Sequence, residues 1–178
     1  MTTETDLIIR NATPEDRQVI AALQTASWRS AYAEFMPAAY LETEVEGDMT
    51  RHWASVEMKP SDVVLIAEKE GVAIGFITVW CRPTPFIDNL HVLPGHKSQG
   101  VGRALMREAA IRLIDQNHAS VYLWVLPGNA PAKNFYLRLG GEVTEAKDKA
   151  AFGNVLLQEK IAWTDLSLIL EAAARTRA

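Results

Sequence analysis

One stretch of this chain constrains its fold more than any other: a β-strand, a loop with two glycines and a helix follow one another directly. The strand is expected at residues 86–93, ended by Pro94-Gly95, and the helix at about residues 100–117. Apolar residues recur every four positions in this helix, a spacing typical of a buried helix face. They are Val101, Leu105, Ala109 and Leu113. A further strand is expected at residues 121–126, and such a strand–helix–strand unit predicts a parallel pair joined by a right-handed crossover.

The strands on either side of this unit make the predicted sheet a mixed one. Residues 63–67 and 72–80 are apolar and rich in β-branched side chains, and the turn at Glu70-Gly71 between them predicts an antiparallel hairpin. The other expected elements are strands at 7–10, 142–144 and 155–163, and helices at about 13–32, after 37, around 53, at 129–139 and after 163. The sequence therefore predicts an α/β (mixed α+β) fold with a mostly antiparallel sheet of about six to seven strands, one parallel pair and helices on both faces.

Length, charge and cysteine content exclude several classes of protein. The chain has 178 residues, the usual size of one domain. Its single cysteine, Cys81, excludes an intrachain disulfide and disfavours a thiolate zinc site. The net charge of −4 argues against nucleic acid as a partner.

The sequence predicts a cytoplasmic protein with no membrane partner. The N-terminus does not resemble a signal peptide. The longest apolar run, residues 63–67, is too short to cross a membrane.

The glycine loop at residues 97–102 is a candidate site for a phosphate group. Glycines let a ligand approach the backbone closely, and free N–H groups at a helix start attract anions. A P-loop would need Lys-Ser/Thr after its last glycine, but Val101-Gly102 follows Gly100. A dinucleotide-binding loop would need a glycine at Leu105 and an acid at Leu126. Taken alone, the loop fits equally well a helix cap that binds no ligand.

A second motif follows the strand at 121–126, and together with the glycine loop it supports one interpretation of the site. It reads Asn129-Ala130-Pro131-Ala132-Lys133-Asn134-Phe135-Tyr136-Leu137-Arg138-Leu139-Gly140-Gly141. Together with Lys97-x-x-Gly100-x-Gly102 it resembles the GNAT N-acetyltransferase superfamily. Lys97 departs from the commonest first residue, arginine or glutamine, and Gly141 stands where phenylalanine is usual. The resemblance is strongest over residues 62–163, and a weaker one to a small bacterial branch is carried by Trp28-Arg29-Ser30-Ala31-Tyr32, Pro37 and Trp53.

The resemblance implies the acyl-CoA N-acyltransferase fold, in which the parallel strands splay apart and the pantetheine of acetyl-CoA lies between them. It implies a single domain over residues 1–178, with acceptor-side helices at about 13–58, an acetyl-CoA core at about 62–163 and a helical tail at 164–178. No metal ion is expected to be required. The residues expected to bind acetyl-CoA are Leu90, His91, Val92, Lys97, Ser98, Gln99, Gly100, Val101, Gly102, Arg103, Ala104, Asn129 and Lys133.

Several of these residues also have an interpretation without a ligand. Asn129 fits the N-cap of the helix that it precedes. Lys133 and Arg103 fit exposed positions on their helices, where charged side chains are usually solvated.

The same resemblance assigns chemistry to two residues. The reaction is direct transfer of the acetyl group from the thioester to a primary amine, which must first lose a proton because its pKa is about 10. Tyr136 matches the tyrosine that protonates the leaving thiolate; the alternative is a core aromatic. Asp88 is the candidate base, with a carboxylate in a salt bridge at the strand end as the alternative. Glu34 and His91 are the other candidates for the base.

The acceptor is expected to be a primary amine of a small molecule or a peptide. The acids Glu34, Glu42, Glu44, Glu46 and Asp48 would attract a cationic amine if they face the pocket. A homodimer is a further expectation, because homodimers are common in the family and the tail at 166–174 offers an apolar surface. The alternative function is a non-catalytic acetyl-CoA-binding or regulatory module on the same fold.

Overall fold

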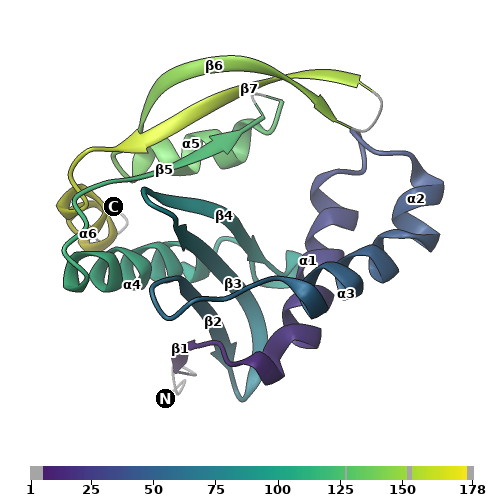
Figure 1. Ribbon diagram of the computed structural model, residues 1–178, viewed down its shortest axis with the longest axis horizontal. Helices are drawn as coiled ribbons and strands as arrows, with labels where there is room; N and C mark the ends of the chain where they lie inside the picture. Colours follow the sequence, from purple (N-terminus) through teal and green to yellow (C-terminus); the bar gives the residue numbers. More distant parts are fainter. Residues whose placement is uncertain (1–5, 127, 152–153, 176–178) are drawn as a thin grey trace.

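A seven-stranded sheet organises the computed structural model, which describes residues 6–126, 128–151 and 154–175 (Figure 1). Its strands are β1 (Leu7–Asn11), β2 (Val63–Lys69), β3 (Val72–Cys81), β4 (Pro85–Val92), β5 (Val121–Val125), β6 (Glu142–Ala151) and β7 (Asn154–Trp163). They lie in the order β1-β2-β3-β4-β5-β7-β6. Only β4 and β5 pair in parallel among the described strands. The predicted fold class, a mixed sheet with one parallel pair, is confirmed.

Helices cover both faces of this sheet (Figure 1). They are the 3-10 turns η1 (Pro14–Asp16) and η2 (Pro94–His96), and the α-helices α1 (Arg17–Ala31), α2 (Ala38–Thr43), α3 (Val45–Ser55), α4 (Val101–Asp115), α5 (Ala130–Arg138) and α6 (Ser167–Ala174). One core joins α1 and α3 to β2 and β3 through residues such as Ile20, Trp53 and Phe76. The other joins α4 and α6 to the opposite face through residues such as Leu105 and Ile169.

The two cores follow from the alternation of side chains along the central strands. Phe76 of β3 packs in the core under α1, whereas its neighbour Ile77 packs in the core under α4, as the twofold period of a strand requires. Gly75 allows β3 and β4 to lie close together, because a Cβ atom there would stand 2.8 Å from the carbonyl oxygen of His91. The centre of the sheet is therefore buried on both faces.

The parallel strands β4 and β5 touch at one point and then part. Their register pairing in the described residues is the single pair Phe86 and Tyr122, where the two rings stack with centroids 5.1 Å apart. The antiparallel neighbours β5 and β7, by contrast, pair over the whole length of β5, from Val121 to Val125. The sheet is therefore interrupted at its middle, beside α5 (Figure 1).

Two expectations about the end of the chain need correction. The strand expected at 142–144 extends as β6 to Ala151, because it pairs with β7 along its length rather than burying an apolar face. Several apolar residues of the tail are buried and do not form a free surface. Leu166, Ile169 and Ala172 are at most 5% exposed and pack in the core that contains α4, whereas Leu168 is 38% exposed. The homodimer stays a prediction, with less apolar surface to support it than the sequence suggests.

Candidate active site

A cavity of about 1420 Å³ runs through the interruption of the sheet. Leu90, Tyr136 and Val101 line it on the α4 and α5 side, while Trp28 and Asp48 line it on the α1 and α3 side. Because an intact sheet separates its two faces, a cavity lined from both faces passes between the parted β4 and β5. Pockets for single small ligands usually measure about 300–1,000 Å³, so this one has room for two substrates that meet inside the sheet.

The start of α4 forms one end of the cavity. Gly100 is the N-cap residue, and its φ of 80° lies in the left-handed region that favours glycine. The first backbone bond of the helix runs from Ala104 N–H to the Gly100 carbonyl, at 3.0 Å. The N–H groups of residues 101–103 therefore precede the helix's own hydrogen-bond ladder. With Lys97 and Arg103 also lining this end, the arrangement suits a bound anion.

Most residues predicted to bind acetyl-CoA lie along this cavity. Those that line it are Leu90, His91, Val92, Lys97, Ser98, Gly100, Val101, Gly102, Arg103 and Asn129. Gln99, Ala104 and Lys133 are outside the lining. The Gln99 side chain donates to the Gly95 carbonyl at 3.4 Å, the Ala104 N–H belongs to the helix ladder, and Lys133 Nζ lies 2.8 Å from Glu159 Oε1.

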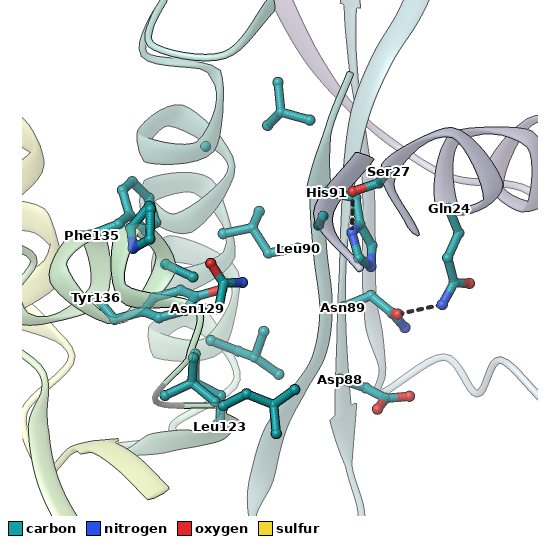
Figure 2. Close-up of a pocket in the computed structure, with 18 of the residues that line it drawn as sticks. Gln24, Ser27, Asp88, Asn89, Leu90, His91, Leu123, Asn129, Phe135 and Tyr136 are labelled. Atoms are coloured by element: carbon teal, nitrogen blue, oxygen red, sulfur yellow. Dashed lines mark hydrogen bonds between the residues drawn. The ribbon is translucent and has the colours of Figure 1, made fainter. Parts of the chain in front are cut away.

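Tyr136 lies in the middle of the cavity. Its ring packs edge-to-face against Phe135 and Trp163, with centroids 5.3 and 6.1 Å away. Figure 2 shows Tyr136 pointing from α5 toward β4. Burial, and secondarily the neighbouring Tyr32, raises the pKa of the Tyr136 hydroxyl above its ordinary value. The phenol therefore carries its proton at neutral pH and is able to donate it.

A β-bulge in β4 places Asp88. In the pairing with β3, Thr78 faces Asn89 and Val79 faces Ile87, so Asp88 is an extra residue. Bulges change the direction of side chains, and Figure 2 shows Asp88 and Asn89 on the side of α1, whereas Leu90 points to the side of Tyr136. The exposed carboxylate of Asp88 accepts a hydrogen bond from Trp80 Nε1 at 2.9 Å and lines the cavity.

The two other candidates for the base differ sharply in position. His91 lines the cavity, and its Nδ1 lies 2.8 Å from the hydroxyl oxygen of Ser27. Burial, and secondarily the charge of Lys97, lowers the pKa of His91 to about 4. The imidazole is therefore neutral at physiological pH. Glu34 is exposed and stands outside the cavity lining.

The far end of the cavity is built by α1, α3 and the β6–β7 hairpin. Of the acids predicted to face an acceptor, Asp48 lines it, whereas Glu42, Glu44 and Glu46 are exposed and do not. Hydrogen bonds from Tyr40 and then Arg51 lower the pKa of Asp48. Sequence reasoning missed the hairpin residues that also line this end, because nothing local marks a strand as one wall of a pocket. They are Lys149, Leu156 and Gln158.

Comparisons with known proteins agree with this geometry. Residues 22–141 match the acetyltransferase (GNAT) family, and the chain belongs to that family. It is 29% identical to the uncharacterized N-acetyltransferase YuaI of Bacillus subtilis over 168 residues, which cover 90% of this chain and 95% of YuaI. The predicted class, an acetyl-CoA-dependent N-acetyltransferase, is confirmed.

Solved structures show the same fold at low sequence identity. A GCN5-related N-acetyltransferase from Rhodopseudomonas palustris has a TM-score of 0.71 at 22% identity, covering 91% of this chain and 97% of that one. The structure of yncA from Salmonella typhimurium, which contains its cofactor acetyl-CoA, has a TM-score of 0.68 at 17% identity, covering 97% of each chain.

The described residues include neither a candidate membrane-spanning helix nor a candidate metal-binding cluster. No helix among residues 6–126, 128–151 and 154–175 has the length and apolar character to cross a membrane. The same ranges contain no group of three or more histidine, cysteine and acidic side chains that could hold a metal ion.

Proposed function

We propose that this chain moves the acetyl group of acetyl-CoA directly to a primary amine of a small molecule or a peptide. The observation that carries the proposal is the continuous cavity between β4 and β5. Amides at a helix start lie at one end of it, a protonated tyrosine in its middle and a carboxylate on the other side of the sheet. These are the groups needed to hold a phosphate, release a thiol and receive a proton from an amine.

Acetyl-CoA binds on the α4 and α5 side in this proposal. Its pyrophosphate lies against the N–H groups of residues 101–103 and the cations Lys97 and Arg103, since a helix start attracts anions. The pantetheine lies along β4 beside Leu90 and Val92, where the missing contact with β5 leaves room for an added extended chain. The acetyl-CoA in the yncA structure, which has the same fold, supports this assignment.

The acceptor amine enters from the side of α1, α3 and the hairpin. Asp88, directly or through a water molecule, takes a proton from the ammonium group and leaves a nucleophilic amine. The amine nitrogen forms a bond to the thioester carbon while a backbone N–H of β4 stabilises the negative carbonyl oxygen. The C–S bond then breaks, Tyr136 gives its proton to the leaving sulfur, and the second proton that the nitrogen loses restores the phenol of Tyr136. A cationic acceptor suits this end, because, among the described residues, the two acids Asp48 and Asp88 line it beside the single lysine Lys149.

Two measurements on the purified protein test the proposal. Isothermal calorimetry with acetyl-CoA tests binding, and the release of free thiol in the presence of a broad panel of amines tests transfer. We expect binding together with amine-dependent thiol release. Binding without release for any amine would instead support the non-catalytic module, and the absence of binding would reject both functions.

A further inference from the structure

Four buried polar side chains connect α3 to β4 beside the candidate base. The indole N–H of Trp53 donates to Gln24 Oε1 at 2.6 Å, and Gln24 Nε2 donates to Asn89 Oδ1 at 3.1 Å. Asn89 Nδ2 then donates to Thr78 Oγ1 at 2.9 Å. All four residues are at most 7% exposed. We call them the polar chain; Figure 2 shows its bond between Gln24 and Asn89.

The hydrogen bonds of the polar chain have one direction. The indole of Trp53 is a donor only, so Gln24 must turn its oxygen to Trp53 and its NH₂ group to Asn89. Asn89 then accepts with its oxygen and donates with its nitrogen to Thr78. The orientation of each amide is therefore fixed by its neighbour. The sequence starts at Trp53, whose indole N–H can only donate. A chain of this kind holds its last member in one rotamer and one orientation.

Stability alone does not explain this arrangement. Trp53 packs in an apolar core with Ile20 and Phe76, Thr78 is fully buried, and Gln24 and Asn89 also line the cavity. At buried positions, apolar side chains of the same shape would pack at similar or lower free energy. Buried networks instead restrict the structure around them to one geometry when every member is paired. The restriction is greatest at the last bond of the polar chain, between Asn89 of β4 and Thr78 of β3.

The hydrogen bond between Asn89 and Thr78 lies next to the β-bulge and holds it in place. Thr78 and Asn89 form the register pair directly before the shift that leaves Asp88 without a partner in β3. Their side chains are bonded to each other across the two strands, and Gln24 holds Asn89 from α1. Without the bulge, Asp88 would share a strand face with Leu90. With it, Asp88 lies on the side of α1, as Figure 2 shows.

We propose that the polar chain is a positioning device: it fixes the bulge, and so it sets Asp88 toward the acceptor and the Leu90 backbone toward the acetyl group. This inference rests on the proposed function, in which these two residues flank the reacting atoms. It makes Gln24, Asn89 and Thr78 positioning residues for the transfer step. It also makes the acceptor-side helices α1 and α3 part of the support of the reaction centre.

Thr78→Val is the sharpest test, because valine keeps the shape of threonine and removes the hydroxyl that accepts from Asn89. Asn89→Leu removes the link from both sides. Thr78→Ser keeps the hydroxyl and is the conservative rescue. Thr25→Val is the matched control: Thr25 lies on α1, is also buried and is outside the cavity lining, and its hydroxyl donates to the carbonyl of Ala21 at 2.8 Å. The kinetic constants and the acetyl-CoA affinity are measured for each variant.

We expect Thr78→Val and Asn89→Leu to lower kcat by about 10- to 100-fold, the loss typical of small misplacements of reacting groups. Their affinity for acetyl-CoA should change by less than about threefold, roughly 0.65 kcal/mol, while Thr78→Ser and Thr25→Val keep the wild-type kcat. If Thr78→Val does not fold, Gln24→Met interrupts the polar chain at α1 and should show the same loss of kcat.

Each contrary result has a distinct meaning. A wild-type kcat in folded Thr78→Val and Asn89→Leu overturns the positioning role and leaves the proposed function intact. An equal loss of kcat in Thr25→Val also overturns it, because the effect is then one of core packing. A wild-type protein that binds acetyl-CoA and acetylates no amine overturns the proposed function, and the positioning role with it.

Discussion

The hydroxyl oxygen of Ser27 lies 2.8 Å from Nδ1 of His91 and so links α1 to the C-terminal end of β4. The imidazole also packs against Phe76, with ring centroids 5.4 Å apart. An imidazole held in this way remains neutral at pH values where an ordinary histidine becomes charged, because its pKa is lowered to about 4. The His91 side chain therefore adds no charge to the cavity from neutral to mildly acidic pH.

This pKa predicts a loss of stability in mild acid. In the unfolded chain His91 has an ordinary pKa of about 6.5, and in the folded chain the pKa is about 4. Between these values the unfolded state binds more protons, so stability falls as the pH drops from about 6.5 toward about 4. Thermal melts across this range should show a flatter slope for His91→Gln than for the wild type. His52→Gln, at an exposed position, is the control, and an unchanged slope in His91→Gln would contradict the prediction.

Gly102→Val should weaken acetyl-CoA binding by about tenfold or more, roughly 1.4 kcal/mol. A Cβ atom at Gly102 would stand 3.3 Å from Phe135 Cζ, and the added methyl groups would occupy the approach to the amides at the start of α4. Gly95→Ala, in η2 just before the loop, is the control, since a Cβ there meets no atom within 4 Å. Calorimetry measures both, and a folded Gly102→Val with wild-type affinity would refute the proposed pyrophosphate site.

Tyr136→Phe should lower turnover by about 10²-fold while the acetyl-CoA affinity stays nearly the same. The substitution keeps the ring that packs on Trp163 and removes the proton donor, and proton transfer by a side chain typically contributes about 10²–10⁴-fold. Tyr122→Phe is the matched control, because Tyr122 stacks on Phe86 and does not line the cavity. Equal turnover in wild type and Tyr136→Phe would make Tyr136 a packing residue.

Asp88→Asn should lower turnover by about 10²-fold or more. The amide oxygen still accepts from Trp80 Nε1, so the local structure is kept while the group that receives the amine proton is lost. The expected loss should shrink at high pH, where more of the acceptor amine is already unprotonated. Turnover equal to the wild type across the pH range would assign the base to another group.

The charge of the acceptor end predicts a preference for cationic amines, and added salt should weaken this preference. Asp48 and Asp88 line this end, so the KM of a diamine or polyamine should rise with salt concentration, since salt screens charges beyond about 10 Å at 0.1 M. The KM of a neutral, weakly basic amine should change little. Better turnover of anionic acceptors than of polyamines would show that the two acids do not select the substrate.

Local patterns predicted the parts of the site that depend on short sequence distances. The loop from Lys97 to Gly102 and the helix that carries Tyr136 each lie within one continuous motif, because a helix start and a helix face are set by neighbouring residues. The sheet with its one parallel pair followed from apolar strands and turn residues. Whether these residues act on acetyl-CoA stays a prediction.

The remaining features depend on contacts between distant residues. The bonds from Gln24 to Asn89 and from Trp53 to Gln24 join separate parts of the sequence, and no local pattern marks them. The bulge at Asp88 appears only when the register of β3 is known. The predicted strand at 142–144 is shorter than β6 because most residues of β6 are polar and residues 142–150 are exposed, and its partner strand β7 determines its length.

The single pairing of β4 with β5 has a consequence for the lifetime of the protein. The two parts of the sheet, β1–β4 and β5–β7, share one register pair among the described residues. In the proposed function acetyl-CoA lies along β4 in this interruption, and its binding would then favour the folded form by mass action. We therefore expect the enzyme to resist proteolysis best where acetyl-CoA is plentiful, so that its abundance follows the supply of its own acetyl donor.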